Sequence, residues 1–364
     1  MVLVLLALTA ALAFANGAND NCKGVATLVA FGETSERRAL YWAAASTAAG
    51  SLVSIAFAGG LVAAFRARFV NGGEGLSPLF FAAVLIGAVA WVLFATRSGL
   101  PVSTTHAITG GLLGAGVLAV GSAQIGWGEV ARRFALPLLL GPLVSLLAVF
   151  AVGRPLAVLA ARRRDRCLCV QGPSAVTTDG TLTAASSFTL IHGTTTECSA
   201  SGATPILRGG GVLRASHWGT SGLVGFARGW NDAPKISALA LVALPAERSW
   251  VAFGLVTVAM AAGGLLQGRK VLETLARKIT SLPLAESLSA SGVSAVLVGL
   301  ASWNGLPLST THVTTGGIVG AGLSRDRRSV RWGVVRDIAL SWVITLPASA
   351  LVAGLAYLLL AWAA

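Results

Sequence analysis

The chain has 364 residues, of which 55% are hydrophobic and 11% are charged, and its mean hydropathy is +0.77. Soluble domains carry about 25% charged residues, so this composition excludes an ordinary soluble protein and predicts an integral membrane protein. The net charge of +13 would suit a nucleic-acid partner, but the basic residues gather in hydrophilic connections. We therefore expect a lipid bilayer as the surroundings and no nucleic acid.

Apolar stretches follow one another along the chain, and we expect each to be helical. Several reach roughly 20 residues, the length that crosses a bilayer. The first stretch lacks a basic flank and runs into polar residues that recur later, so we interpret it as a helix of the protein and not as a secretory signal. The stretches cover residues 2–15, 39–65, 79–96, 134–160, 236–244, 250–266, 288–301 and 338–363.

Two motifs occur twice, once in each half of the chain. FANGANDNCK at residues 14–23 matches FARGWNDAPK at residues 226–235 at 6 of 10 positions. GLPVSTTHAITGGLLGAG at residues 99–116 matches GLPLSTTHVTTGGIVGAG at residues 305–322 at 13 of 18 positions. Because the two pairs are separated by nearly the same length of chain, we interpret the protein as two homologous halves.

Each half is predicted to contain a helix interrupted at Gly-x-Asn-Asp and an apolar hairpin that turns back at the Ser-Thr-Thr-His tetrad. A hairpin that enters and leaves on one side gives each half an odd number of crossings, so the second half must be inverted. The expected fold is an all-α integral membrane protein with two inverted-topology repeats, each with a broken helix and a re-entrant helical hairpin. The repeats are expected at residues 1–160 and 216–364, with a linker loop at 161–215.

The distribution of arginine and lysine predicts the orientation. With both termini outside, the positive-inside rule places the linker loop in the cytoplasm. The connections expected inside carry basic clusters at residues 162–166, 269–278 and 325–336. Those expected outside carry Arg66, Arg68, Arg132, Arg133 and Arg248. We expect a multi-pass protein of the cell membrane.

The duplicated tetrads are candidate anion sites. The Gly-x-Pro before each tetrad is expected to end the incoming helix, and Ser103 and Ser309 are placed to cap the next one. Capping alone would explain one such motif. Two opposed tips, however, would bring six hydroxyls and two helix N-termini to one point, where a tetrahedral oxyanion could bind. The candidate substrate-binding residues are Ser103, Thr104, Thr105, Ser309, Thr310 and Thr311. The glycines that follow each tetrad are expected to let helices approach closely.

The Gly-x-Asn-Asp motifs supply charged groups at membrane depth. Asp20 and Asp232 are the acids expected inside membrane segments, where a charge costs roughly 3 kcal/mol. Lys23 and Lys235 follow three residues later, on the same helical face. Structural salt bridges are the alternative, but ionisable groups inside membranes usually mark function. The candidate ion-coupling residues are Asn19, Asp20, Lys23, Asn231, Asp232 and Lys235.

Taken together, these motifs resemble those of the inorganic phosphate transporter (PiT) family of secondary carriers. The resemblance rests on the two duplicated motifs and on VLETLARKIT at residues 271–280, and it covers nearly the whole chain outside residues 161–215. It implies that the hairpin hydroxyls hold inorganic phosphate, that Asp20 and Asp232 are essential to coupling, and that transport proceeds by alternating access with Na+ or H+. We expect a symporter with no catalytic residue, no cofactor and no metal.

One departure from the family pattern bears on the coupling ion. The sodium-coupled pattern commonly continues as Gly-Ala-Asn-Asp-x-x-Asn, and Lys23 and Lys235 occupy the last position here. An amide oxygen can ligate Na+, whereas an ammonium has no acceptor. We therefore expect H+ coupling or a cation-independent route, with Na+ disfavoured.

Four further polar residues lie near these motifs. Arg97 and Arg228 each lack a counterpart in the other half, and they either complete a positive site for a phosphate dianion or extend to an interface. His106 and His312 are predicted to be hydrogen-bonded at helix ends, with a proton relay as the alternative.

The linker loop contains Cys167, Cys169 and Cys198, with His192 nearby. Their spacing is not that of a regular zinc site, so no metal is expected there. In a cytoplasmic loop the thiols should be reduced. The composition leaves room for strands or for a flexible cover.

Three rival functions remain. A permease for sulfate or another oxyanion could use the same fold, although sulfate has no proton to give to an aspartate. An intramembrane aspartic hydrolase would need carboxyls that share a proton, and the lysine beside each aspartate disfavours this. A passive channel would not support uphill uptake. The oligomeric state stays open, and a homo-oligomer is compatible with the sequence.

Overall fold

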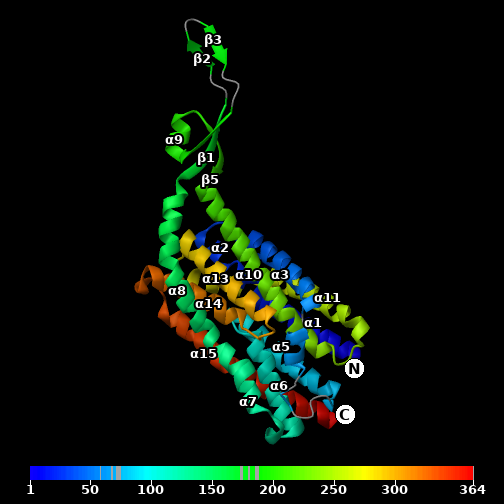
Figure 1. The fold of residues 1–364 in the computed structure, drawn as a ribbon. Coiled ribbons are helices and arrows are strands. Elements are labelled where there is room, and N and C mark those ends of the chain that lie inside the picture. Colours follow the sequence, from blue (N-terminus) through cyan, green and yellow to red (C-terminus); the bar gives the residue numbers. More distant parts are fainter. Residues whose placement is uncertain are drawn as a thin grey trace.

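The computed structural model describes residues 1–57, 59–66, 69–70, 75–172, 175–178, 181–184 and 188–363, and Arg68 lies outside them. The described chain is a bundle of helices with a small strand-bearing segment at one end (Figure 1). Seven helical stretches in the described ranges are long and apolar enough to cross a membrane, which confirms the predicted multi-pass protein. They are Val2–Gly24, Glu36–Phe57, Pro78–Arg97, Trp127–Arg164, Ala246–Gln267, Leu284–Trp303 and Trp332–Ala363.

The first half of the chain consists of helices that follow the predicted apolar stretches. Its elements are α1 (Val2–Asp20), the 3-10 turn η1 (Asn21–Gly24), α2 (Ala26–Phe31), α3 (Glu36–Phe57), α4 (Gly59–Phe65), α5 (Pro78–Arg97), α6 (Thr104–Val120), η3 (Ser122–Gln124), α7 (Trp127–Val130), the π-helical turn η4 (Ala131–Ala135) and α8 (Leu136–Arg164).

The second half repeats this order. Its elements are α10 (Gly209–Ala240), η5 (Ala246–Arg248), α11 (Ser249–Gln267), α12 (Arg269–Glu273), the π-helical turn η6 (Thr274–Lys278), α13 (Leu284–Trp303), α14 (Thr310–Arg325), η7 (Arg327–Ser329) and α15 (Trp332–Ala363).

The predicted helix break at Gly-x-Asn-Asp is present in the first half and wrong in the second. In the first half α1 gives way to the turn η1, which contains Gly24. Glycine costs about 1 kcal/mol in a helix interior relative to alanine, and a Cβ at Gly24 would lie 3.0 Å from the backbone nitrogen of Gly225. The second half has Ile236 at this place, and α10 continues through Gly229 and Pro234 without interruption.

Equivalent helices of the two halves exchange partners. α1 packs against α11 and α10 packs against α3, while α6 packs against α15 and α14 packs against α8. Glycines make these contacts close, as predicted: a Cβ at Gly110 or at Gly316 would lie 2.3 Å from the carbonyl oxygen of Leu346 or Pro142, respectively. Such reciprocal packing is what a two-fold relation between the halves produces.

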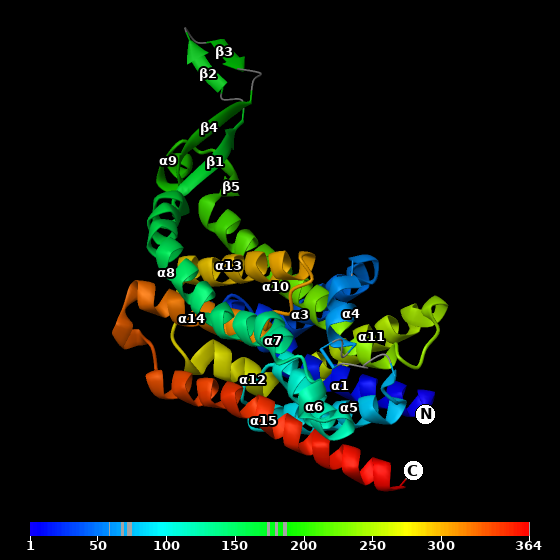
Figure 2. The ribbon, with the colours of Figure 1, turned by 60° about the horizontal axis from the view of Figure 1, so that its bottom comes forward.

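The directions of the helices agree with inverted repeats. In both ribbon views α10 begins at the strand-bearing segment, whereas its equivalent, α1, begins at the opposite end of the bundle, near the C-terminus (Figures 1 and 2). Equivalent helices therefore start at opposite ends, as an inverted second half requires. The termini lie together, away from the strand-bearing segment.

The strand-bearing segment falls within the expected linker. β1 (Arg166–Gln171) is the central strand of an antiparallel sheet between β4 (Thr189–Thr194) and β5 (Thr204–Arg208). The helix α9 (Thr195–Ala200) follows β4, and β2 (Ala175–Thr178) pairs with β3 (Thr181–Ala184). Cys169 and Cys198 form a disulfide, whereas we expected reduced thiols. Because β1 packs against α9, the Cα atoms of the two cysteines lie 6.2 Å apart, within the range that a disulfide spans.

Two large apolar cores lie in the membrane bundle, and the duplicated polar motifs fall between them. One core joins residues of α1, α5, α6 and α11. The other joins residues of α2, α3, η6 and α14. The end of α1 and the turn η1 pass from one core to the other, and there the chain buries Asn16, Asn19, Asp20 and Lys23. The fold therefore places the candidate site between two packed apolar layers.

Candidate functional site

The two hairpin tips have the same local structure. Gly99 and Gly305 adopt left-handed backbone conformations, with φ of 71° and 65°, and end the incoming helices α5 and α13. Glycine takes this conformation without steric cost. Ser103 then accepts a hydrogen bond of 3.2 Å from the backbone nitrogen of His106, and Ser309 accepts one of 3.3 Å from that of His312. The predicted N-caps of α6 and α14 are thus confirmed.

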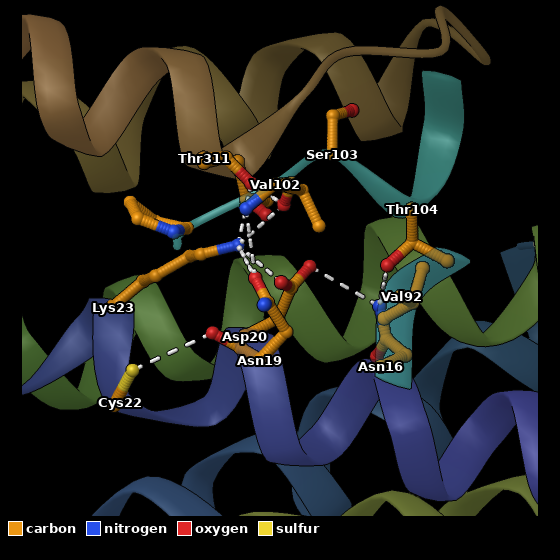
Figure 3. A network of polar contacts seen from close by, with 12 residues as sticks. Asn16, Asn19, Asp20, Cys22, Lys23, Val92, Val102, Ser103, Thr104 and Thr311 are labelled. Carbon is orange, nitrogen blue, oxygen red and sulfur yellow. Dashed lines mark hydrogen bonds and ion pairs between the residues drawn. The ribbon is translucent and has the colours of Figure 1, made fainter. Parts of the chain in front are cut away.

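Lys23, which follows the first Gly-x-Asn-Asp motif, contacts both hairpin tips. The ammonium pairs with Asp20 and also donates to the carbonyl oxygen of Val102 at 3.1 Å (Figure 3). A further hydrogen bond joins it to the hydroxyl of Thr311, in the hairpin of the other half. Asn19 accepts from the backbone nitrogen of Val102 at 3.0 Å. Since Asp20 and Lys23 are each only 2% exposed, this ion pair is closed off from water.

The second motif makes the reciprocal contacts. Lys235 lies 3.3 Å from Asp232 and donates to the carbonyl oxygen of Leu308 at 2.9 Å. It also donates to the hydroxyl of Thr105 in the first half at 2.9 Å. Asn231 donates to the same Leu308 carbonyl at 2.8 Å. Each lysine therefore joins the tip of its own half to the threonine of the opposite tip.

Arg228 is the central cation of the cluster, in line with the first of the two alternatives drawn from the sequence. Its side chain is fully buried, and Nε lies 3.4 Å from an oxygen of Asp232. The guanidinium also donates to the side-chain oxygens of Asn16 and Asn21. The interface alternative is therefore wrong for Arg228, whereas Arg97 is exposed and lies outside the cluster. In the sequence, Arg228 differs from its equivalent in the first half, Asn16, and this asymmetry marks the two residues that contact each other in the structure.

Asn16 connects the two carboxylates. Its amide nitrogen lies 3.1 Å from an oxygen of Asp20 and 3.3 Å from an oxygen of Asp232, and it lies 3.0 Å from the hydroxyl of Thr104. Figure 3 shows this amide between Asp20 and the start of α6. The buried cluster thus contains three basic side chains and two carboxylates.

Hydroxyls from both tips surround this cluster. Thr104, Thr105 and Thr311 accept hydrogen bonds from Asn16, Lys235 and Lys23, and Thr310 is buried at the start of α14. The structure therefore brings the predicted substrate-binding and ion-coupling residues of both halves into one buried region. Helix N-termini, hydroxyls and cations together are suited to an oxyanion.

His106 and His312 meet behind the tips. Their ring centroids lie 4.7 Å apart with the rings nearly perpendicular, and His312 also packs on Trp342 at 3.9 Å. The prediction of hydrogen-bonded rings is wrong for Nδ1, which has no partner on either histidine within the described residues. Aromatic packing holds these rings instead.

The VLETLARKIT motif supports the first tip. Thr274 donates to the carbonyl oxygen of Gly99 at 2.9 Å, and Lys270, the residue just before the motif, donates to that of Arg97 at 3.1 Å. Arg277 forms an ion pair of 2.8 Å with Glu36 of α3. The motif therefore holds the hairpin of the first half against a helix that carries no site residue.

Comparison with known proteins identifies the family. A family model described as the phosphate transporter family matches residues 16–353. The chain belongs to this family. A probable low-affinity inorganic phosphate transporter of Rhizobium meliloti is 28% identical over 352 residues, which cover 94% of this chain and 92% of the relative. A relative of the same name in Mycobacterium tuberculosis is 27% identical over 373 residues, which cover 98% of this chain and 77% of the relative.

A solved structure described as the sodium-dependent phosphate transporter has the same fold. It superposes with a TM-score of 0.77 over 99% of both chains, at 23% sequence identity. The membership of the phosphate transporter family confirms the predicted family and the prediction that the protein is a transporter and not an enzyme. The alternative of an intramembrane aspartic hydrolase is thereby set aside.

Proposed function

We propose that this phosphate transporter is a secondary active symporter that works by alternating access and couples phosphate movement to H+ rather than Na+. The observation that carries the proposal is the position of Lys23 and Lys235. Each ammonium lies against an aspartate, a hairpin carbonyl and a threonine hydroxyl. These are oxygen ligands of the kind that a bound cation would need, and the ammonium already satisfies them.

Phosphate would bind at the facing tips. Ser103, Thr104, Ser309 and Thr310 lie at the first turns of α6 and α14, where backbone N–H groups have no intrahelical acceptor. The contacts from the lysines to Thr105 and Thr311 place positive charge beside these hydroxyls. An oxyanion between the tips would therefore meet hydroxyls, N–H donors and ammonium groups together.

Charge balance supports one proton for each phosphate dianion. Three buried cations and two carboxylates leave one positive charge in the cluster. A dianion would change this to one negative charge, which is costly at membrane depth, and one proton would neutralise it. Asp20 and Asp232 are our candidates for the proton carrier. They are also the groups that could accept the hydrogen bond of hydrogen phosphate, which sulfate cannot donate.

We place both termini outside the cell and the strand-bearing segment in the cytoplasm. The basic clusters at residues 162–166 and 325–336 support this orientation through the positive-inside rule.

The deciding experiment is radiolabelled phosphate uptake into proteoliposomes, with the pH gradient and the Na+ gradient imposed separately. We expect uphill uptake when the outside is acidic and K+ replaces Na+, and its loss on adding a protonophore. Excess sulfate should not compete. Uptake that requires Na+ at a fixed ratio would overturn the coupling, and uptake that never exceeds equilibrium would indicate a channel.

A further inference from the structure

Three cysteine sulfurs meet in the strand-bearing segment. Cys167 and Cys169 occupy alternate positions of β1 and so point to the same face of the sheet, where α9 presents Cys198. The Sγ atoms of Cys167 and Cys169 lie 3.1 Å apart, and all three sulfurs lie within 4.8 Å of one another. All three side chains are buried.

Among the side chains that the structure describes, this unit has almost no other apolar core. The buried residues beneath the sheet are the three cysteines and Ala203, with Ile191 packed at the edge. So small an apolar cluster does not hold three strands and a short helix together, and units of this size usually depend on a disulfide or a structural metal. The sulfurs must therefore supply a cross-link.

A disulfide uses only two of the three sulfurs. It leaves the Cys167 thiol buried, with only a contact of 3.3 Å to the carbonyl oxygen of Thr194 and its approach to Cys169. A metal would use all three. Zinc–sulfur bonds of about 2.3 Å put ligand sulfurs roughly 3.8 Å apart, which these three positions can provide with small side-chain movements.

The surroundings of the three sulfurs are basic. A hollow of about 710 Å³ borders Cys167 and is lined by Arg162, Arg163 and Arg166. Three thiolates with one Zn2+ carry a single negative charge, which the arginines would balance, and the hollow leaves room for a fourth ligand such as water.

We propose that Cys167, Cys169 and Cys198 form a structural site for a thiophilic cation of the Zn2+ class, which binds when the thiols are reduced and fastens β1 to α9. The site is independent of the transport mechanism proposed above. It requires a reducing compartment, as the cytoplasm provides.

The test uses the full-length protein in detergent, kept reduced with a phosphine that does not compete strongly for metal. We expect one Zn2+ per chain by elemental analysis, and thiolate-to-metal charge-transfer absorption when Co2+ replaces it. Removal of Zn2+ with a chelator should make the strand-bearing segment sensitive to protease. Absence of bound metal in the reduced protein would overturn the proposal.

Cys167→Ser separates the two cross-links, because it leaves the Cys169–Cys198 pair intact. In the reduced protein the metal site predicts that this variant loses Zn2+ and protease protection. A unit held by the disulfide would instead be protected only when it is oxidised, with or without the Cys167 thiol. Cys22→Ser is the matched control, since Cys22 lies in η1 of the membrane bundle, and it should keep the metal. Metal loss in both variants would contradict the assignment. So would a quantitative Cys169–Cys198 disulfide in protein from cells lysed with a thiol-blocking reagent.

Discussion

Lys235 in the second half of the chain donates a hydrogen bond of 2.9 Å to the hydroxyl of Thr105 in the first half. Lys23 makes the equivalent contact with Thr311 in the opposite direction. Since each lysine also bonds a carbonyl in the hairpin of its own half, two fixed charges join the two tips. In the transport cycle that we propose, phosphate and protons enter a region that these charges hold together.

Replacing both lysines by asparagine tests whether they take the place of a cation. Lys23→Asn with Lys235→Asn would restore an amide oxygen beside each aspartate and remove the charge that balances it. We expect either Na+-dependent uptake or its abolition, because an unpaired buried carboxylate costs several kcal/mol. The measurement is the uptake of labelled phosphate into proteoliposomes by the double variant, with and without Na+.

Two results would contradict this account of the lysines. One is strict Na+ dependence of the unmodified protein. The other is unchanged, Na+-independent uptake by the double variant. Lys270→Asn is a suitable control for the loss of a lysine, since Lys270 bonds the carbonyl of Arg97 at the surface and lies outside the buried cluster.

Removing single tip hydroxyls should weaken phosphate binding without unfolding the protein. Ser103→Ala, Thr104→Ala, Ser309→Ala and Thr310→Ala should each cost about 1 kcal/mol, roughly a fivefold rise in Kd. Binding of labelled phosphate to purified protein, alongside its thermal unfolding, measures both effects. Thr109→Ala is the control, because this hydroxyl lies one turn later in α6 and bonds only the carbonyl of Thr105. Normal affinity in all four variants would refute the site.

Arg228→Met should damage both stability and transport. It leaves Asp232 with Lys235 as its remaining cation and Asn16 without the guanidinium, and breaking a buried pair in this way costs about 3–5 kcal/mol. Arg97→Met removes an arginine of the same type from an exposed position and should behave like the unmodified protein. Thermal unfolding in detergent and uptake assays compare the two. Equal stability of both variants would show that Arg228 is not the centre of the network.

Orientation is open to cysteine labelling with a reagent that does not cross the membrane. Arg328→Cys should be protected from reagent added outside, whereas Ser122→Cys should react. Gly73, in the connection that we expect outside, lies beyond the described residues, so we use the exposed Ser122, which lies three residues before Ile125 in the bridge to Val70. The reverse labelling pattern would invert the orientation and leave the fold unchanged.

Close packing of α6 against α15 can be tested at one glycine. A Cβ at Gly114 would lie 2.0 Å from the carbonyl oxygen of Ala350, so Gly114→Ala must push the helices apart and should destabilise the protein by about 1–3 kcal/mol. Gly299 in α13 has no atom within 4 Å of an added Cβ, and Gly299→Ala should be neutral or slightly stabilising. A wild-type unfolding temperature for Gly114→Ala would contradict the packing.

Local chemistry allowed much of the site to be predicted from the sequence. Serine after a Gly-x-Pro turn predicts an N-cap, and the three-residue spacing of Asp20 and Lys23 predicts an ion pair, because each depends on residues close together in the chain. The repeat predicted that the tips would meet. The family resemblance added the identity of the anion.

Contacts between distant helices could not be predicted in the same way. Arg228 meets Asn16 because α1 and α10 cross at these positions, and no periodicity in either helix shows that crossing. The meeting of His106 with His312 likewise depends on how two hairpins pack. The continuity of α10 escaped prediction because Pro234 removes only one helical hydrogen bond, and the packing around it decides whether the helix bends or breaks.

The exchange of partners between the halves limits how the protein can move. α6 packs on α15, and α14 packs on α8, through glycines that bring the two helix backbones into contact. We therefore expect each hairpin tip to move together with the last helix of the opposite half. A rocking motion of the N-terminal half against the C-terminal half would break both of these helix–helix contacts. In the alternating-access cycle that we propose, each rigid body is therefore assembled from both halves of the chain.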